Sequence, residues 1–409
     1  MTDPVFLRRV VLRNYKSISS CDVGLGPLTY LLGPNGSGKS NFVDALHLVR
    51  DALAGSLDHA LSERGGLTEV RRRSGGHPTH FGIRLEMRLP DDGRPAVYAF
   101  RVGAVKGGDY EVQTEYCAIG SGKGAGPSFR LENGRVAATS EDSFPAVTSD
   151  RLGLVAGSGL TAFRPVYDAL TSMGFYNLNP KLMRELQKPQ DGRLLKPAGE
   201  NIASVLRQLG RVPEREALNA IEEYLKAVVP TVHGVEHKAV GPMETLEFRQ
   251  DMAGSQHPWR FLAQNLSDGT LRALGILTAL FQGDHEPSRL VGIEEPETAL
   301  HPGAFAALRE ALKRAAEQRQ VLITSHSPDL LDDGDLSADA LLAVVADEGE
   351  TRIAPADSAS RELLQDHLFT AGELLRLNQL VPDTEVLSRQ SERQLDLFRS
   401  EPDSARLAD

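Results

Sequence analysis

One octapeptide, GPNGSGKS at residues 33–40, constrains this chain more than any other segment. It fits the pattern G-x-x-x-x-G-K-[ST], in which the backbone N–H groups of a glycine-rich loop surround nucleotide phosphates. An apolar run at 28–32 precedes it and predicts a buried parallel strand. After it, apolar residues recur at helical spacing up to residue 53, which predicts a helix with one buried face. A strand, a glycine loop and a helix in this order predict a P-loop fold that binds a nucleoside triphosphate.

Each residue of this loop has an expected part in holding the phosphates. They would lie at the helix N-terminus, where unpaired N–H groups and the positive end of the helix dipole meet. Lys39 would contact the β- and γ-phosphates, and the Ser40 hydroxyl would bind Mg²⁺. A glycine-rich turn that binds nothing is the alternative. The predicted nucleotide contacts are Gly33, Pro34, Asn35, Gly36, Ser37, Gly38, Lys39, Ser40 and Asn41.

Two polar segments follow predicted strands further along the chain. Glu294 and Glu295 come directly after the apolar run 290–293, and His326 follows the run 321–324. The carboxyl ends of parallel strands are where ligands bind in open α/β sheets. Glu294 would hold Mg²⁺ through water, Glu295 would deprotonate the attacking water, and His326 would contact the γ-phosphate or that water. The alternatives are a solvated acidic turn and a structural histidine.

A third segment, Ser267-Asp268-Gly269, opens a predicted helix with leucines along one side. Ser267 and Asp268 are natural N-cap residues, so capping alone explains them. A serine, a glycine and a helix N-terminus are also what a phosphate needs. The spacing alone does not choose between these two interpretations.

Composition describes an ordinary soluble globular chain: 41% hydrophobic and 25% charged residues, with a net charge of −11. No apolar run reaches the roughly 18 residues of a membrane span, and no signal peptide begins the chain, so we expect a cytoplasmic protein. Two cysteines predict no disulfide framework. Basic residues cluster at 8–9, 13–16 and 71–73, but the acidic balance neither supports nor excludes DNA as a partner.

The chain also changes character along its length. Residues 79–140 alternate apolar and polar side chains, which predicts an antiparallel meander with a loop at 120–127. Helices are predicted between 160 and 230, and a hairpin at 231–240 and 243–250. Strands then alternate with helices, as in a parallel α/β sheet. The tail beyond about 385 is polar, which predicts a flexible segment.

Taken together, these motifs resemble the ABC-type ATPase heads of the RecF, structural-maintenance-of-chromosomes (SMC) and OLD group. The order matches: phosphate loop 33–40, signature segment 265–270, carboxylates 294–295, D-loop 297–301 and a switch histidine at 326. The chain is most similar to bacterial predicted ATPases of the AAA-ATPase-like, RecF- and OLD-related kind. They have a similar SDGT signature, IEEPE segment and C-terminal stretch such as 370–376.

The resemblance implies an α/β P-loop fold of ABC-ATPase type: a mixed, largely parallel sheet core, an antiparallel β-subdomain and a helical lobe carrying the signature. It implies ATPase lobe I at 1–160, helical lobe II at 161–285, lobe I again at 286–380, and a polar tail at 381–409. It also implies that two heads pair head-to-tail around two ATP molecules. Ser267, Asp268 and Gly269 of one subunit would then complete the site of the other, and Glu295-assisted hydrolysis would release the dimer.

Some features depart from transporter-type heads. Transporter signatures read LSGGQ, whereas Asp268 and Thr270 stand here, and Glu294 stands where transporters carry Asp. These departures disfavour a transporter subunit. The Q-loop glutamine is not placed, with Gln113 a weak candidate. Arg13 and Lys16 lie where this group often has basic residues near the nucleotide or DNA, and ordinary surface residues are the alternative.

Two functions follow from the resemblance. The first is a homodimerising ATPase that controls double-stranded DNA or a DNA-acting partner in DNA repair or antiviral defence. The second is an ATP-gated regulator of a toxin or nuclease encoded nearby, without direct DNA contact. Between Ser40 and Ser267 there is no heptad run for a long coiled coil, and the segment after His326 is short for a nuclease domain. We therefore expect a compact head whose nuclease, if there is one, is a separate chain.

Overall fold

A computed structural model describes residues 5–74, 76, 78–89, 92–107, 109–120, 126–211, 215–255, 257–282, 289–392 and 397–398. The chain divides into two compact units. Unit 1 comprises Met1–Met173, Ser337–Leu368 and Leu377–Asp409, and unit 2 comprises Gly174–Leu336 and Phe369–Arg376. The lobe boundaries predicted from the motifs stay a prediction, because the two units are defined by internal contacts and not by nucleotide binding.

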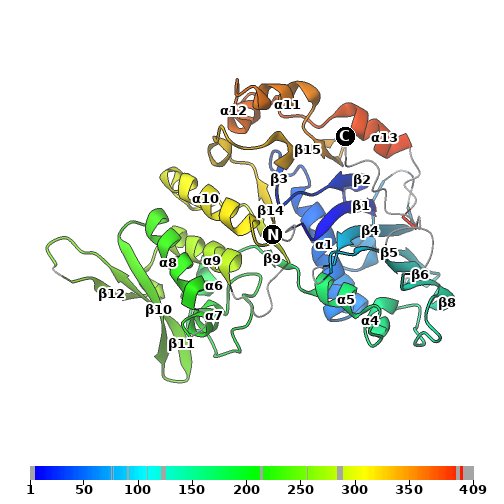
Figure 1. Ribbon diagram of the computed structural model, residues 1–409, viewed down its shortest axis with the longest axis horizontal. Helices are drawn as coiled ribbons and strands as arrows, with labels where there is room; N and C mark the ends of the chain where they lie inside the picture. The colour runs from blue at the N-terminus through cyan, green and yellow to red at the C-terminus, as the bar shows by residue number, and fades with distance from the viewer. Residues whose placement is uncertain are drawn as a thin grey trace. The chain divides into compact units, whose positions relative to one another are not determined.

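Unit 1 contains an antiparallel sheet of seven strands in the order β2-β1-β4-β5-β6-β7-β8 (Figure 1). The meander predicted for residues 79–140 is therefore confirmed, although residues 121–125 of the predicted loop lie outside the described part. The strands of this sheet are β1 (Leu7–Tyr15), β2 (Ile18–Gly24), β4 (His80–Arg88), β5 (Pro95–Ala104), β6 (Tyr110–Ile119), β7 (Ser128–Glu132) and β8 (Arg135–Thr139). One face buries a run of edge-to-face aromatic rings, Tyr15, Phe81 and Phe100, which stabilises the sheet beyond its area burial.

A second group of strands in unit 1 carries the phosphate loop. β3 (Leu28–Leu32) pairs in parallel with β15 (Leu341–Asp347), and β15 pairs antiparallel with β16 (Glu350–Pro355). The strand predicted at 28–32 is thus confirmed, and its partner comes from the far end of the chain. The helices of unit 1 are α1 (Lys39–Ala54), α2 (Leu57–Ser62), α3 (Leu67–Val70), α4 (Gly153–Gly157), α5 (Arg164–Thr171), η4 (Ala338–Ala340), α11 (Ser358–Gln365) and α13 (Thr384–Glu392).

In unit 2, parallel strands are flanked by helices and an antiparallel arm. β13 (Leu290–Glu294) lies between β14 (Gln320–Ser325) and β9 (Gly174–Tyr176), parallel to both. β10 (Val232–Val240), β11 (Met243–Gln250) and β12 (Trp259–Leu262) form the arm, next to α8 in Figure 1. The helices of unit 2 are α6 (Pro180–Arg184), α7 (Ile202–Leu209), α8 (Arg215–Val228), η1 (Ala263–Asn265), α9 (Asp268–Phe281), η2 (Pro302–Ala304), α10 (Phe305–Ala316), η3 (Asp329–Leu331) and α12 (Ala371–Arg376).

Helix α9 forms the centre of unit 2. Every residue from Thr270 to Leu280 is buried, so this helix is covered on all sides rather than along one stripe. The predicted leucine face is therefore correct but incomplete. Because α9 packs against α8, α6 and β13, its N-terminus is held in a fixed place within the unit.

The prediction of a flexible tail beyond about residue 385 is wrong for residues 384–392. These residues form α13, which packs on β2 and β16. Gln390 is buried, and its amide donates to the carbonyl oxygens of Asp22 and Ile353. These hydrogen bonds hold α13 against β2 and β16, and a polar sequence alone does not indicate them. Residues 393–396 and 399–409 lie outside the described part of the chain.

The state of the cysteines and the character of the helices can be compared with the sequence analysis. Cys21 and Cys117 are both buried free thiols, as expected for a chain without a disulfide framework. Among the described helices, none has the length and apolar character to cross a membrane.

Candidate functional site

The phosphate loop joins the end of β3 to the start of α1 in unit 1. Gly38 is the N-cap of α1 with φ 100°, and Gly36 has φ 78°, so both adopt the left-handed backbone that favours glycine. A Cβ on Gly38 would lie 1.9 Å from Thr351 Oγ1, so this position has no room for any side chain. The first turn of α1 carries no acidic residue, which leaves the positive end of its dipole available to an anion.

The side chains of the loop fit a bound phosphate. Lys39 is buried, and its Nζ donates to the carbonyl oxygens of Gly33 at 2.8 Å and Pro34 at 2.9 Å. The ammonium therefore lies folded across the loop. The buried Ser37 hydroxyl has no hydrogen-bond partner among the described atoms. Pro34, Asn35, Gly36 and Ser40 are exposed, so the outer face of the loop is open to a ligand.

Thr351, at the start of β16, supports this loop, and sequence reasoning missed it. Its Oγ1 donates to the Ser37 carbonyl at 2.8 Å and lies 2.7 Å from Ser17 Oγ. The Asn41 amide donates to the same Ser17 hydroxyl at 2.6 Å. The Asn41 side chain thus holds the neighbouring turn, while its predicted contact with nucleotide stays a prediction. No sequence signal marks Thr351, because it lies more than 300 residues from the loop that it contacts.

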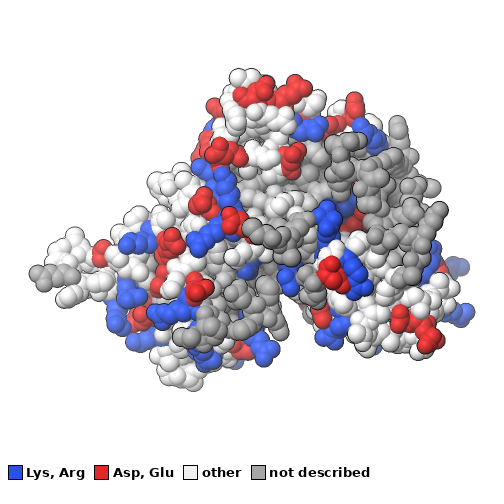
Figure 2. Space-filling model, in the orientation of Figure 1, with Lys and Arg blue, Asp and Glu red and all other residues white. Residues whose placement is uncertain are grey.

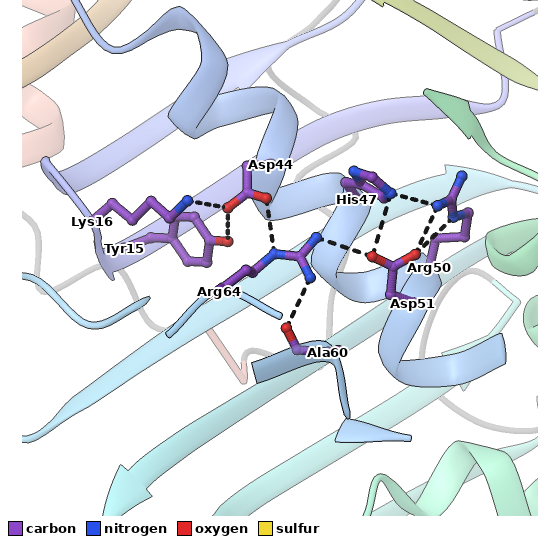
Figure 3. A network of polar contacts seen from close by, with 8 residues as sticks. All are labelled: Tyr15, Lys16, Asp44, His47, Arg50, Asp51, Ala60 and Arg64. Atoms are coloured by element: carbon purple, nitrogen blue, oxygen red, sulfur yellow. Dashed lines mark hydrogen bonds and ion pairs between the residues drawn. The ribbon is translucent and has the colours of Figure 1, made fainter. Parts of the chain in front are cut away.

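Lys16, a candidate for contact with nucleotide or DNA, belongs to an ion network on α1 (Figure 3). Its Nζ lies 2.6 Å from Asp44 Oδ2, and the Tyr15 hydroxyl donates to the same oxygen at 2.7 Å. Arg64 donates through Nε to Asp44 at 2.8 Å and through Nη2 to Asp51 at 3.0 Å. Burial alone would raise the pKa of Asp44, but Arg64, Lys16 and Tyr15 together lower it. In this structure Lys16 therefore stabilises the turn that packs on α1.

Two other candidates of unit 1 lie in its sheet. Arg13 stands on β1 opposite Ser20, and burial lowers its pKa against the opposing effect of Asp22. Gln113, the weak Q-loop candidate, lies within β6 with its side chain over Gly103. Their proposed roles stay predictions.

The carboxylate pair of unit 2 lies at the end of β13. Glu294 is the last residue of the strand, in register with Thr324 of β14. Glu295 follows with φ 44°, a left-handed conformation that costs a non-glycine residue about 1–3 kcal/mol. Its N–H donates to the carbonyl and the hydroxyl of Thr324, at 3.0 and 3.2 Å. At this turn 39% of the Glu295 side chain is exposed, so its carboxylate is accessible to water.

His326 stands next to this carboxylate, as the sequence predicted from its place after the neighbouring strand. Its Nδ1 lies 3.3 Å from Glu295 Oε1 and 3.7 Å from Glu297 Oε1. Glu297, predicted only as part of the D-loop, is buried and accepts hydrogen bonds from Ser325 Oγ at 2.7 Å and from the His326 N–H at 3.2 Å. Glu297 therefore fixes the backbone that carries the histidine. Two adjacent acids and a histidine at parallel strand ends are suited to general-base chemistry on water.

Ser267 caps α9, as one of its two interpretations predicted. Its Oγ accepts the Thr270 N–H at 3.1 Å, and the Asp268 carboxylate pairs with Arg184 at 2.5 Å. A cavity of about 470 Å³ opens beside this N-terminus, lined within unit 2 by Ser267, Gly269, the D-loop and the end of α8. Capping does not exclude a second role, and the contact with a nucleotide of another subunit stays a prediction.

The fold, the phosphate loop and the acidic and histidine residues at the ends of β13 and β14 define a class of protein, an ABC-type ATPase head of the RecF, SMC and OLD group. The chain belongs to the family described as "AAA domain, putative AbiEii toxin, Type IV TA system", whose model matches residues 28–332. An OLD nuclease of Thermus scotoductus is 25% identical over an alignment of 346 residues, and the match covers 79% of this chain and 59% of that protein. The DNA replication and repair protein RecF of Vibrio vulnificus is 39% identical over 44 residues, 10% of this chain and 12% of RecF.

Solved structures agree on the fold. An Smc head bound to the C-terminal winged-helix domain of ScpA superposes with a TM-score of 0.55 at 14% identity, covering 85% of this chain and 97% of that one. An Smc head with an extended coiled coil, derived from Pyrococcus furiosus, gives a TM-score of 0.52 at 12% identity, covering 89% and 99%. The ABC-ATPase α/β fold predicted from the motifs is thereby confirmed. The chain spans about three fifths or less of the length of the curated relatives that it matches.

Proposed function

We propose that this protein hydrolyses ATP, with the phosphates bound by loop 33–40 and the attacking water activated by Glu295. The observation that carries the proposal is the pairing of Glu295 with His326, 3.3 Å apart at the ends of two parallel strands. The buried, unpartnered Ser37 hydroxyl and the acid-free start of α1 support a phosphate at the loop. Family membership supports ATP as the nucleotide.

The residues then have distinct tasks. The Glu295 carboxylate accepts a proton from water, and His326, whose Nδ1 lies 3.3 Å from that carboxylate, holds the water or the γ-phosphate by a hydrogen bond. The Lys39 ammonium exchanges its two carbonyl contacts for phosphate oxygens, which are stronger, charge-assisted acceptors. Ser40 and Glu294 would hold Mg²⁺, which would neutralise developing charge on the phosphates.

We further propose that two copies pair head-to-tail, so that Ser267, Asp268 and Gly269 of one copy complete the ATP site of the other. The cavity beside the α9 N-terminus supports this arrangement, because it leaves that N-terminus open to a ligand. ATP would hold the dimer together, and hydrolysis would release it. The resemblance to RecF and Smc heads supports the same mode of action.

The dimer would control double-stranded DNA or a DNA-acting partner, in repair or in antiviral defence. The similarity to an OLD nuclease and to RecF supports this function. The second candidate is an ATP-gated regulator of a toxin or nuclease without DNA contact. The interspersed basic and acidic side chains on the visible face of unit 2 support it, because they form no concentrated basic patch there (Figure 2).

The variant Glu295→Gln tests the ATPase proposal. It keeps the size and backbone of the residue but cannot accept the proton, so we expect unchanged ATP affinity, turnover reduced at least about 100-fold, and a dimer that persists in ATP. Solution mass and phosphate release measure both. Hydrolysis by this variant at the wild-type rate would refute the role of Glu295.

A second variant, Ser267→Arg in the Glu295→Gln background, tests the shared site. It should bind ATP yet stay monomeric, because the added side chain occupies the α9 N-terminus. A dimer of normal affinity would exclude the shared site. ATP turnover with and without duplex DNA, at 50 and 200 mM salt, then separates the two candidate functions. Stimulation by DNA that falls steeply with salt supports the first, and no response supports the second.

A further inference from the structure

Arg272, on α9, is a buried arginine whose guanidinium contacts only backbone carbonyls among its described hydrogen-bond partners. Nη1 donates to the Leu178 carbonyl at 2.7 Å. Nη2 donates to the carbonyls of Glu294 at 3.2 Å and Glu295 at 3.0 Å. Arg272 is 8% exposed, and burial lowers its pKa against the opposing effects of Glu297 and Glu295. A buried cation on these two carbonyls holds the backbone that carries the predicted base.

The backbone at Glu295 needs such support. Its left-handed conformation is unfavourable for a residue with a Cβ, and it persists only where surrounding contacts fix it. Thr324 holds the N–H side of this residue, while Arg272 and the Thr298 N–H hold its carbonyl. Without Arg272, the Glu295 carbonyl loses its charged hydrogen-bond donor. The carboxylate would then move relative to His326.

Helix α9 connects this support to the signature segment. Arg272 lies five residues after Ser267, about 7.5 Å along the helix at 1.5 Å per residue. The same N-terminus touches the D-loop, because a Cβ on Gly269 would lie 2.5 Å from the Ala299 carbonyl oxygen. Ala299 also has a left-handed backbone, with φ 65°. The start of α9 is therefore in direct contact with the segment 295–299, whose two ends have left-handed backbones.

We propose that Arg272 is a positioning residue that couples the signature helix of each subunit to that subunit's own Glu295. This rests on the function proposed above. In the head-to-tail dimer, Ser267 receives ATP bound to the partner, whereas Glu295 acts on ATP bound to its own subunit. Arg272 thereby links the two composite sites, so that ATP seated on one signature helix aligns the base of the other site. An arginine suits this task, because its rigid fork reaches several carbonyls and stays charged when buried.

The test compares Arg272→Lys with Arg319→Lys in the full-length protein. Arg319 is an equally buried arginine of unit 2 whose Nη1 donates to the Gln282 carbonyl, at the opposite end of α9. It therefore controls for the loss of a buried guanidinium. Arg272→Lys should lower kcat about 100-fold, the cost of a base displaced by roughly 1 Å. The affinity of Arg272→Lys for ATP and the affinity of its ATP-dependent dimer should stay within twofold of wild type. Arg319→Lys should lose a similar amount of melting temperature as Arg272→Lys but keep kcat within threefold of wild type.

A second variant covers the case in which Arg272→Lys does not fold. Thr324→Val keeps the side-chain volume but removes the hydroxyl, one of the two Thr324 oxygens that accept the Glu295 N–H, so it should also lower kcat without changing ATP affinity. Hydrogen exchange reports the coupling without activity. In the Glu295→Gln background, ATP should slow hydrogen exchange of the backbone amides of residues 294, 295 and 297–299. Adding Arg272→Lys should reduce that protection at least about tenfold while the dimer persists.

The outcomes separate the two proposals. A slow Glu295→Gln enzyme together with a fast Arg272→Lys enzyme overturns the role of Arg272 alone. Equal losses of kcat in Arg272→Lys and Arg319→Lys overturn it too, since they indicate general destabilisation. Wild-type hydrolysis by Glu295→Gln overturns the proposed function, and this inference fails with it.

Discussion

Replacing Thr351 by valine should weaken nucleotide binding, although this residue belongs to no sequence motif and lies more than 300 residues along the chain from the phosphate loop. Thr351 is 2% exposed, and its hydroxyl donates to the Ser37 carbonyl at 2.8 Å inside the phosphate loop. Valine has nearly the same shape but no hydroxyl. The buried carbonyl then loses its donor, and the Ser17 hydroxyl keeps only the Asn41 amide among these partners.

The magnitude follows from these contacts. A buried acceptor that loses its donor costs about 1–3 kcal/mol, with about 2 kcal/mol as the central value. Part of this cost appears in the free energy of unfolding. If the whole cost falls on the conformation of the loop, the fraction of protein ready to bind drops about 30-fold, because 1.4 kcal/mol corresponds to a factor of ten. We therefore expect the apparent Kd to rise between about threefold and 30-fold.

Calorimetric titration with a non-hydrolysable ATP analogue measures the affinity, and urea unfolding measures the stability. Thr351→Ser is the matched control. It keeps the hydroxyl and loses only the methyl group, so its Kd should stay within about twofold of wild type. Wild-type affinity in Thr351→Val, or an equal loss in the serine variant, would show that this hydroxyl does not shape the loop.

Three further predictions concern single side chains. Lys39→Ala should raise the Kd for ATP about 10- to 100-fold, through the loss of a charge-assisted phosphate contact; an unchanged Kd in titration would exclude Lys39 from the site. Burial raises the pKa of Glu115 to about 7 from an ordinary 4.5. Between these two pH values the folded protein binds a proton at Glu115 that the unfolded chain has released. The free energy of unfolding should therefore fall by roughly 3 kcal/mol as pH rises from 4.5 to 7. Melting temperatures between pH 4.5 and 8 should show this slope, and Glu115→Gln should flatten it; equal slopes would contradict the assignment. Asp44→Asn should destabilise the protein by about 2 kcal/mol at pH 7 by weakening the pairs with Arg64 and Lys16. Because the folded pKa of Asp44 is lowered, this stability is present above 3.8 and is lost as pH falls through the folded value. The difference from wild type in urea unfolding should therefore shrink in acid, and a constant difference would refute it.

The sequence by itself determined the motifs and their immediate surroundings. The loop at 33–40, the carboxylates at 294–295 and His326 each follow an apolar run that predicts a buried strand, and the structure has a strand at each place. These predictions work because each depends on neighbouring residues alone: apolar side chains form the strand, and polar ones follow at its end. The N-cap role of Ser267 was readable for the same reason.

Only the tertiary structure decided which distant groups support those motifs. Thr351 meets Ser37 from the far end of the chain, Arg272 reaches the carbonyl of Glu295, and the polar residues 384–392 form a docked helix rather than a flexible tail. None of these contacts leaves a periodic pattern, since a hydroxyl or guanidinium that finds a buried carbonyl looks in sequence like any surface residue. The physical reason is that a buried backbone oxygen needs a donor, and folding alone determines which residue comes near enough to provide it.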